Sequence, residues 1–335
     1  MKVTSKNGVK PVKVIYNPKA GKKRQLWSRA PVIALEDIKN LLEQYQITAE
    51  YYPTKQAGHA TILAQEAKRE GYATVIAAGG DGTISEVANG LINSDVYLGI
   101  LPLGSYMNIP RMLSIPNDLE KAVCLLKIGR TRKIDVGIIR ATGEDKLNDS
   151  KDKTVRFSYF LENSSIGLEA QLQQNVLEWE KGNKRAILYF LKTIVEYYAR
   201  RVKITLDEGK VIETRATMVA ISNGPYTGAA LQLAPKAKLN DHLLTISVFR
   251  MSKFKFLLYL LQLMRSGKTS AKQINTYQSK NVRVETRLPR LVHADASVFG
   301  YTPVEYEIIP NALTVISGFP TPEETALVKR TPLDP

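Results

Sequence analysis

A glycine-rich turn between an apolar strand and a helix is the most informative chemical feature of the sequence. It reads Gly79-Gly80-Asp81-Gly82-Thr83, follows the apolar run 73–78 and precedes a helical pattern over 84–92. Glycines let the backbone come close to a ligand, and N–H groups at a helix N-terminus face negative charge. Asp81 adds a carboxylate that could position Mg²⁺ or accept a proton. Gly-Gly-Asp-Gly is also an ordinary turn sequence, so its place between strand and helix is what predicts phosphate binding.

The first part of the chain alternates short apolar strands with helical patterns. Strands are expected at 12–16, 47–52, 73–78 and 97–101, and helices at 33–45, 59–70, 84–92 and 119–128. This alternation predicts a doubly wound parallel sheet, in which ligands bind beyond the C-terminal ends of the strands. Asn17, Thr54 and Ser105 follow such strand ends, as the glycine turn does. An α/β nucleotide-binding domain is therefore expected over residues 10–133.

The second part of the chain has mainly strand patterns. They lie at 134–139, 155–161, 202–206, 216–222, 243–249, 281–285, 304–308 and 313–316. Such a series predicts a mainly antiparallel β-sandwich domain over 134–319. Two helical patterns, 185–201 and 254–264, interrupt it; both favour core packing, with an acyl-chain lining or a membrane-interface face as the alternative.

Several segments together resemble the diacylglycerol kinase-type lipid kinases, the superfamily that includes sphingosine and ceramide kinases, in a bacterial-like form. The glycine turn with Glu86 and Asn89-Gly90 resembles the family signature. Further matches lie at 17–21, 54–60, 101–105, 222–228, 235–243 and 310–313. NAD kinases and phosphofructokinases share a related glycine loop, so the order of the other segments favours the lipid kinases. The resemblance implies an NAD kinase-like first domain, a lipid-substrate sandwich, and a tail over 320–335 that packs back on the first domain.

The resemblance also implies an activity and its residues. The activity is transfer of the γ-phosphoryl group of ATP to a hydroxyl of a lipid such as diacylglycerol. The nucleotide would be held by Asn17, Pro18, Gly21, Thr54, Gly79, Gly80, Asp81, Gly82, Thr83, Glu86 and Ser105. Asp241 and the carbonyl of Leu243 would bind a second Mg²⁺. Asp295 is the expected base for the lipid hydroxyl, and Asp81 could instead act on the acceptor, so both remain catalytic candidates.

Four departures from the family pattern favour a rival function. Ser297 stands where the family usually has a glutamate, His242 replaces a glycine, and Lys238 replaces an acid found in some bacterial members. The segment 106–111 also differs. A lipid-binding or regulatory protein that has lost turnover is therefore an alternative, and an NAD kinase-like enzyme is a less favoured one.

The charge balance is strongly positive. The chain has 47 Lys and Arg against 32 Asp and Glu, a net charge of +15. Such a balance favours polyanions, and no nucleic-acid-binding module is recognisable. We therefore expect a lipid substrate and an anionic membrane surface as partners and no nucleic acid, with a merely soluble basic surface as the alternative. A homodimer is left open.

The remaining composition indicates a cytoplasmic protein that meets the membrane peripherally. The N-terminus has no apolar leader, and no segment approaches the roughly 18 to 20 apolar residues that span a bilayer. The single cysteine, Cys124, excludes an intramolecular disulfide and suits a reducing compartment.

Overall fold

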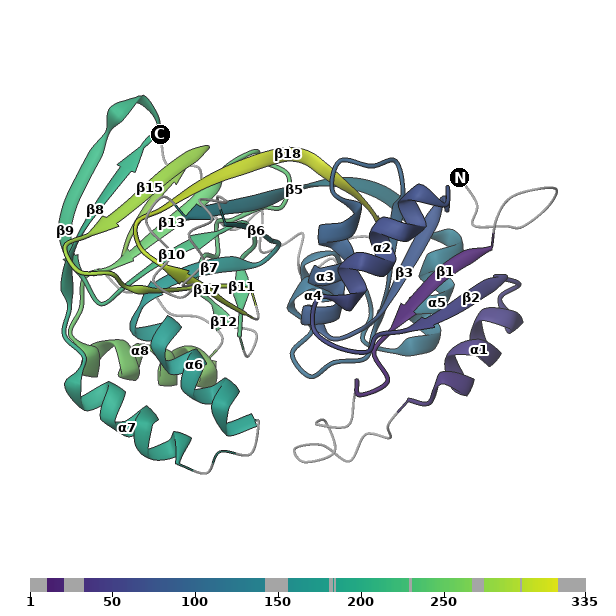
Figure 1. Ribbon diagram of the computed structural model, residues 1–335, viewed down its shortest axis with the longest axis horizontal. Helices are drawn as coiled ribbons and strands as arrows, with labels where there is room; N and C mark the ends of the chain where they lie inside the picture. The colour runs from purple at the N-terminus through teal and green to yellow at the C-terminus, as the bar shows by residue number, and fades with distance from the viewer. Residues whose placement is uncertain are drawn as a thin grey trace, which may run out of the picture. The chain divides into compact units, whose positions relative to one another are not determined.

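The computed structural model describes two compact units (Figure 1), over residues 11–20, 33–141, 156–180, 183, 185–228, 231–266, 274–295 and 297–318. The first unit runs to Ile134 and includes the chain again from Asn311; the second is Asp135–Pro310. The first boundary lies beside the expected 133/134. The second unit ends at Pro310 and not at 319, because the last part of a long strand pairs with the first unit. The expected contact of the tail, 320–335, lies outside the described residues.

The first unit is a parallel sheet with helices between its strands. Its elements are β1 (Val12–Tyr16), α1 (Leu35–Gln44), β2 (Ala49–Pro53), α2 (His59–Arg69), β3 (Thr74–Gly79), α3 (Asp81–Leu91), β4 (Tyr97–Pro102), α4 (Asn108–Met112) and α5 (Leu119–Ile128). The strand order is β2-β1-β3-β4, followed by the last residues of β18 (Val304–Ser317). The predicted doubly wound sheet is confirmed, and the short helix α4 is an addition to it.

Burial explains this arrangement. Every residue of β3 is buried, as expected for a central strand covered on both faces. The connection from β1 to β2 and the connection from β2 to β3 cross the sheet in opposite directions. Because both are right-handed, their helices α1 and α2 lie on opposite faces of the sheet. Helix α2 packs on α3, and α1 on α5. Gly90 allows the first of these contacts, since a Cβ there would lie 2.5 Å from Cβ of Ala64.

The second unit contains two mainly antiparallel sheets. One consists of β5 (Arg130–Ala141), β6 (Phe157–Phe160), β8 (Arg200–Leu206), β9 (Val211–Ala216), β15 (Asn281–Thr286) and the first part of β18, in the order β6-β5-β18-β15-β8-β9. The other has the order β14-β13-β10-β7-β16-β17, with β7 (Asn163–Gly167), β10 (Met218–Ser222), β13 (Leu244–Phe249), β14 (Ile274–Ser279), β16 (Leu291–Ala294) and β17 (Ser297–Tyr301). A small hairpin pairs β11 (Tyr226–Thr227) with β12 (Leu231–Gln232). The predicted β-sandwich is confirmed.

Strand β10 shows how the sandwich is built. Val219 and Ile221 belong to the core between the two sheets, whereas Met218 and Ala220 point to the opposite face. Three helices cover that opposite face: α6 (Leu168–Glu180), α7 (Ala186–Glu196) and α8 (Lys253–Ser266).

The second unit differs from the sequence-based expectation in several elements, since strands β7, β9, β14, β16 and β17 were not expected. Helix α6 was not expected. The expected helix 185–201 ends at Glu196, because β8 begins at Arg200 and pairs with β9 and β15. The two strands expected at 304–308 and 313–316 are one continuous strand, β18.

None of the described helices is long and apolar enough to cross a bilayer.

Candidate active site

The first unit gathers its expected nucleotide residues at the C-terminal edge of the parallel sheet. The strand order has its switch point between β1 and β3, because the chain continues from β1 to β2 on one side and from β2 to β3 on the other. Ligands usually bind at the C-terminal edge of the sheet at such a point. Asn17 follows β1, and its N–H donates to the carbonyl of Ala78 (3.1 Å). Thr54 follows β2, and its N–H donates to the carbonyl of Tyr16 (2.8 Å). These bonds continue the strand pairing into the loops and hold the loop backbones side by side.

Two glycine loops touch at this edge. The N–H of Leu103 donates to the carbonyl of Gly79 (2.9 Å), so the loop after β4 lies against the loop after β3. A Cβ on Gly104 would lie only 2.5 Å from Cα of Gly80. A Cβ on Gly79 would lie 2.6 Å from Cβ of Thr83, in the first turn of α3. The backbone is therefore packed as closely as glycine permits at the N-terminus of α3, where N–H groups have no helical partner.

Asp81 connects α3 to α4. It is the first residue of α3, and its carboxylate accepts the N–H of Ile109 (2.9 Å) and of Asn108 (3.1 Å). A carboxylate is stabilised at a helix N-terminus, and Asp81 lies at two of them. Burial raises the pKa of the Asp81 carboxyl, and hydrogen bonds from backbone N–H groups offset part of that rise. Asp81 is therefore both a positioning residue for the loop after β4 and a carboxylate with increased proton affinity.

The other expected nucleotide residues differ in what they contact. The side chain of Asn17 accepts the N–H of Lys19 (2.9 Å), which closes the turn that includes Pro18. Glu86 accepts the N–H of Ala60 (3.2 Å) and thereby satisfies a donor in the first turn of α2. Ser105 is exposed in the loop after β4.

Two members of the expected set need separate mention. Gly82 lies in the first turn of α3, beside Asp81. Gly21 lies outside the described residues.

Asp295 holds a turn of the second unit. Its carboxylate accepts the N–H groups of Leu161 and Glu162, both at 2.9 Å, and its own N–H donates to the carbonyl of Asn163 (2.9 Å). Its φ is +46°, a conformation that aspartate tolerates better than most residues. The side chain of Asn223 ties the same turn to β5 through the carbonyls of Leu161 (3.1 Å) and Asp135 (3.0 Å). The turn at Leu161 and Glu162 is thus braced by Asp295 on one side and by Asn223 on the other.

Glu162 is a carboxylate that the sequence reasoning missed. It is only 6% exposed, and its N–H is one of the two bound by Asp295. A charged residue between the apolar run that ends at Leu161 and the buried strand 163–167 was the available signal. Ser297, by contrast, donates a hydrogen bond to the carbonyl of Ala294 (3.3 Å).

Comparison with known proteins matches both units. Residues 11–139 match the diacylglycerol kinase catalytic domain, and residues 163–317 match the YegS C-terminal NAD kinase beta sandwich-like domain. The chain belongs to the diacylglycerol kinase-type lipid kinase family.

Relatives of this lipid kinase family align over most of the chain. The diacylglycerol kinase of Staphylococcus aureus (strain JH9) is 26% identical over 303 residues, which are 89% of this chain and 89% of that protein. A crystal structure of diacylglycerol kinases from Bacillus anthracis str. Sterne has a TM-score of 0.67 at 25% identity and covers 93% of this chain and 98% of that one. Another structure from the same strain has a TM-score of 0.69 at 26% identity, covering 93% and 99%.

His242, where the lipid kinase family usually has glycine, has a φ of +60°. This left-handed backbone explains the glycine, and histidine is among the residues that adopt it more readily than most. Asp135, which is fully buried, holds the histidine through its backbone N–H (2.8 Å) and its Nδ1 (2.9 Å). The replacement is therefore accommodated by a new side-chain contact.

The residues around Asp241 fit the expected second Mg²⁺ poorly. Magnesium requires oxygen ligands in octahedral geometry. One Asp241 oxygen accepts the N–H of Leu243 (3.2 Å), and both oxygens of neighbouring Asp135 are bonded to His242. Burial raises the pKa of the Asp241 carboxyl, and Lys238 lies close enough to lower it in part. Among the described residues, no three His, Cys, Asp or Glu side chains gather in a group that could hold a metal ion.

Proposed function

We propose that this protein is an ATP-dependent lipid kinase that transfers the γ-phosphoryl group to a hydroxyl of a lipid such as diacylglycerol. One observation carries the proposal: the two glycine loops pack backbone to backbone beside the N-terminus of α3, and Asp81, the first residue of α3, binds the N–H groups at the start of α4. The names of the relatives from S. aureus and B. anthracis support the lipid acceptor.

Each unit has a proposed part in the reaction. In the first, backbone N–H groups of the Gly79–Thr83 turn would bind phosphate oxygens, because positioning and charge neutralisation do most of the work in phosphoryl transfer. Mg²⁺ carried by ATP would supply further neutralisation of the phosphate charge. In the second unit, Asp295 would accept the proton of the lipid hydroxyl, with Asp81 as the alternative base.

The proposed acceptor gives the protein a place in the cell. A lipid hydroxyl is presented at a bilayer surface, so we propose a cytoplasmic protein that associates peripherally with anionic membranes. The net charge of +15 supports this association, because anionic lipid attracts nearby basic residues.

Transfer of ³²P from γ-labelled ATP to lipids in mixed micelles tests the activity. The panel should contain diacylglycerol, a glycolipid precursor, a long-chain base and a polyprenol, since the residues do not choose among these alcohols. We expect one labelled phospholipid product that depends on both ATP and the acceptor. Absence of transfer to every lipid, with the protein folded and ATP bound, would instead favour the lipid-binding alternative, which is also supported by Ser297 in place of the family's glutamate.

Gly104→Ala is expected to weaken ATP binding and to lower kcat/KM for ATP by about a hundredfold, as misplacement by about 1 Å can do. The new Cβ would lie 2.5 Å from Cα of Gly80, which is backbone and cannot rotate away, so the two loops must separate. Titration calorimetry with ATP and initial rates give the two measurements. Gln65→Ala, at an exposed position of α2, is the control, because it changes a side chain at the surface of the same unit and leaves the glycine loops intact. Equal ATP affinity in Gly104→Ala and the wild type would refute the close contact.

A further inference from the structure

A row of arginines crosses the outer face of the β18-β15-β8-β9 sheet. Arg201 on β8 lies directly opposite Arg215 on β9. Arg287 follows the last residue of β15, Thr286, which pairs with Val202, so Arg287 continues the row beside Arg201. Like charges directly opposite each other destabilise a sheet. Stability alone therefore does not explain this row.

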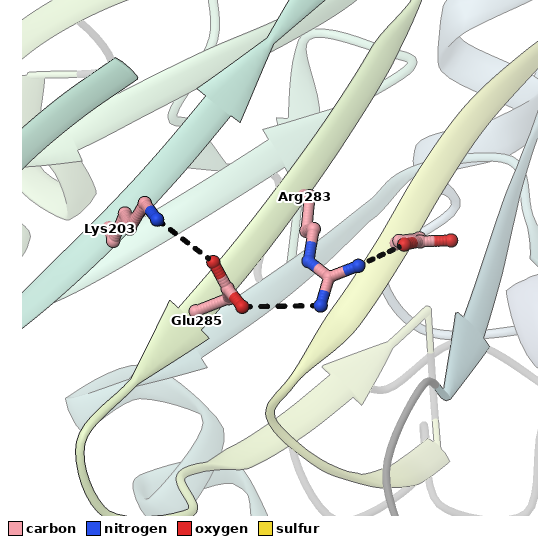
Figure 2. Close-up of polar contacts among 4 residues, drawn as sticks. Lys203, Arg283 and Glu285 are labelled. Carbon is pink, nitrogen blue, oxygen red and sulfur yellow. Dashed lines mark hydrogen bonds and ion pairs between the residues drawn. The ribbon is translucent and has the colours of Figure 1, made fainter. Parts of the chain in front are cut away.

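The neighbouring rows of the same face are neutralised. Figure 2 shows Lys203 bonded to Glu285 (3.6 Å) and Glu285 bonded to Arg283 (3.2 Å). Arg283 also contacts Glu305 on β18 (2.8 Å). Within the described part of the chain, Arg201, Arg215 and Arg287 make no ion pair. The positive charge of the arginine row is thus available to an external anion.

Two adjoining surface grooves, of about 670 and 820 Å³, lie over the row, and all three arginines line both. Glu213 and Glu285 line the first groove as well, together with Lys203. The lining of the second groove has no acidic residue among the described ones and adds two more arginines, Arg200 and Arg290. Burial lowers the pKa of the Arg290 guanidinium, and repulsion from Arg200 contributes to the change.

Exposed apolar side chains border the second groove. Tyr198 is 65% exposed and Leu288 60% exposed, and both line it. The ammonium of Lys253 lies 4.8 Å from the ring of Tyr198 and 5.5 Å from the ring of Phe254, which is also exposed. Lys253 thus connects the end of α7 to the start of α8. Basic residues next to exposed aromatic and aliphatic side chains are typical of surfaces that lie at a membrane interface.

We propose that this surface, the arginine face, docks the protein on the anionic headgroups of a lipid bilayer. The arginine face comprises Arg200, Arg201, Arg215, Arg287 and Arg290 with Tyr198 and Leu288. Guanidinium groups bind phosphate oxygens in pairs, and the apolar side chains reach the acyl boundary. A nucleic acid would use the arginines but not Leu288, so the bilayer fits the whole surface better. The inference rests on the proposed function for its purpose, since a lipid acceptor is presented by a membrane.

Vesicle binding tests the arginine face. The triple variant Arg201→Gln, Arg215→Gln, Arg287→Gln should bind vesicles of phosphatidylcholine with phosphatidylglycerol about a hundredfold more weakly than the wild type, because each basic residue near the surface contributes roughly fivefold. Its thermal stability should equal or exceed the wild type, since like charges are removed. The control Lys68→Gln, Arg69→Gln, Lys121→Gln removes the same charge from exposed positions of the first unit and should change binding by less than about threefold.

The remaining measurements separate the possible occupants and failures. Wild-type binding should fall as salt rises from about 0.1 M to about 1 M, since the Debye length shrinks from roughly 10 Å to roughly 3 Å. Tyr198→Ser with Leu288→Ser should remove the binding that persists at high salt. Equal vesicle binding by both triple variants would overturn the proposal. It would also be overturned if the arginine-face variant lost binding to a short oligonucleotide but still bound vesicles as the wild type does. Vesicle binding needs no catalysis, so a wild type that binds through this face but transfers no phosphate would reject the kinase activity alone.

Discussion

Asp81→Asn is expected to lower the rate of phosphoryl transfer by at least about a hundredfold, the usual contribution of a positioned acid–base or charge-stabilising group. The two carboxylate oxygens accept the N–H groups of Asn108 and Ile109. An asparagine has the same shape, but its amide nitrogen would face one of these donors and its negative charge is gone. Initial rates of ³²P transfer, with thermal unfolding to verify the fold, measure the effect.

The same experiment distinguishes the two roles of Asp81. If it acts mainly by holding the loop after β4, ATP affinity should fall together with the rate. If it acts on a proton or on the phosphate-bound metal, kcat should fall while ATP affinity is retained. Asp95→Asn, at an exposed aspartate of the same unit, is the control and should leave both unchanged. A folded Asp81→Asn protein with near-normal lipid phosphorylation would contradict the assignment of this residue.

Asp295→Asn is expected to abolish turnover while leaving ATP affinity largely unchanged, because the proposed base acts on the acceptor hydroxyl. The nucleotide loops all belong to the first unit, and Asp295 belongs to the second. Its carboxylate also accepts the N–H groups of Leu161 and Glu162, so thermal unfolding must accompany the rates. Wild-type turnover in this variant would reject Asp295 as the base and leave Asp81 as the candidate.

Ser297→Glu complements that variant by restoring the carboxylate typical of the family. Activity should rise if serine marks weakened catalysis, and fall if serine is adapted to a different acceptor. A wild type without any transfer and a Ser297→Glu protein with transfer would identify a kinase that has lost turnover. The pH–rate profiles of both proteins, with the same acceptor, separate an added base from a change in acceptor binding.

Local patterns were enough to predict most of the first unit. Strand and helix periods depend on residues a few positions apart, so the alternation over 12–128 and the glycine turn at Gly79–Thr83 could be read directly. Helix α6 was missed because its apolar residues recur with only a weak helical period. The helix expected over 185–201 was too long, since pairing of β8 with β9 and β15 overrides the helical pattern from Arg200.

The residue types at the candidate site follow from the sequence, but their contacts do not. That Asp81 binds the N-terminus of α4, that Gly80 meets Gly104, and that Asp295 braces the turn at Leu161 all depend on residues 24 or more positions apart. The arginine face is a further case, because Arg287, after β15, comes beside Arg201 on β8 only through the strand register. Chemistry and local conformation are encoded in neighbouring residues, whereas partners across a sheet are chosen by the packing of the whole unit.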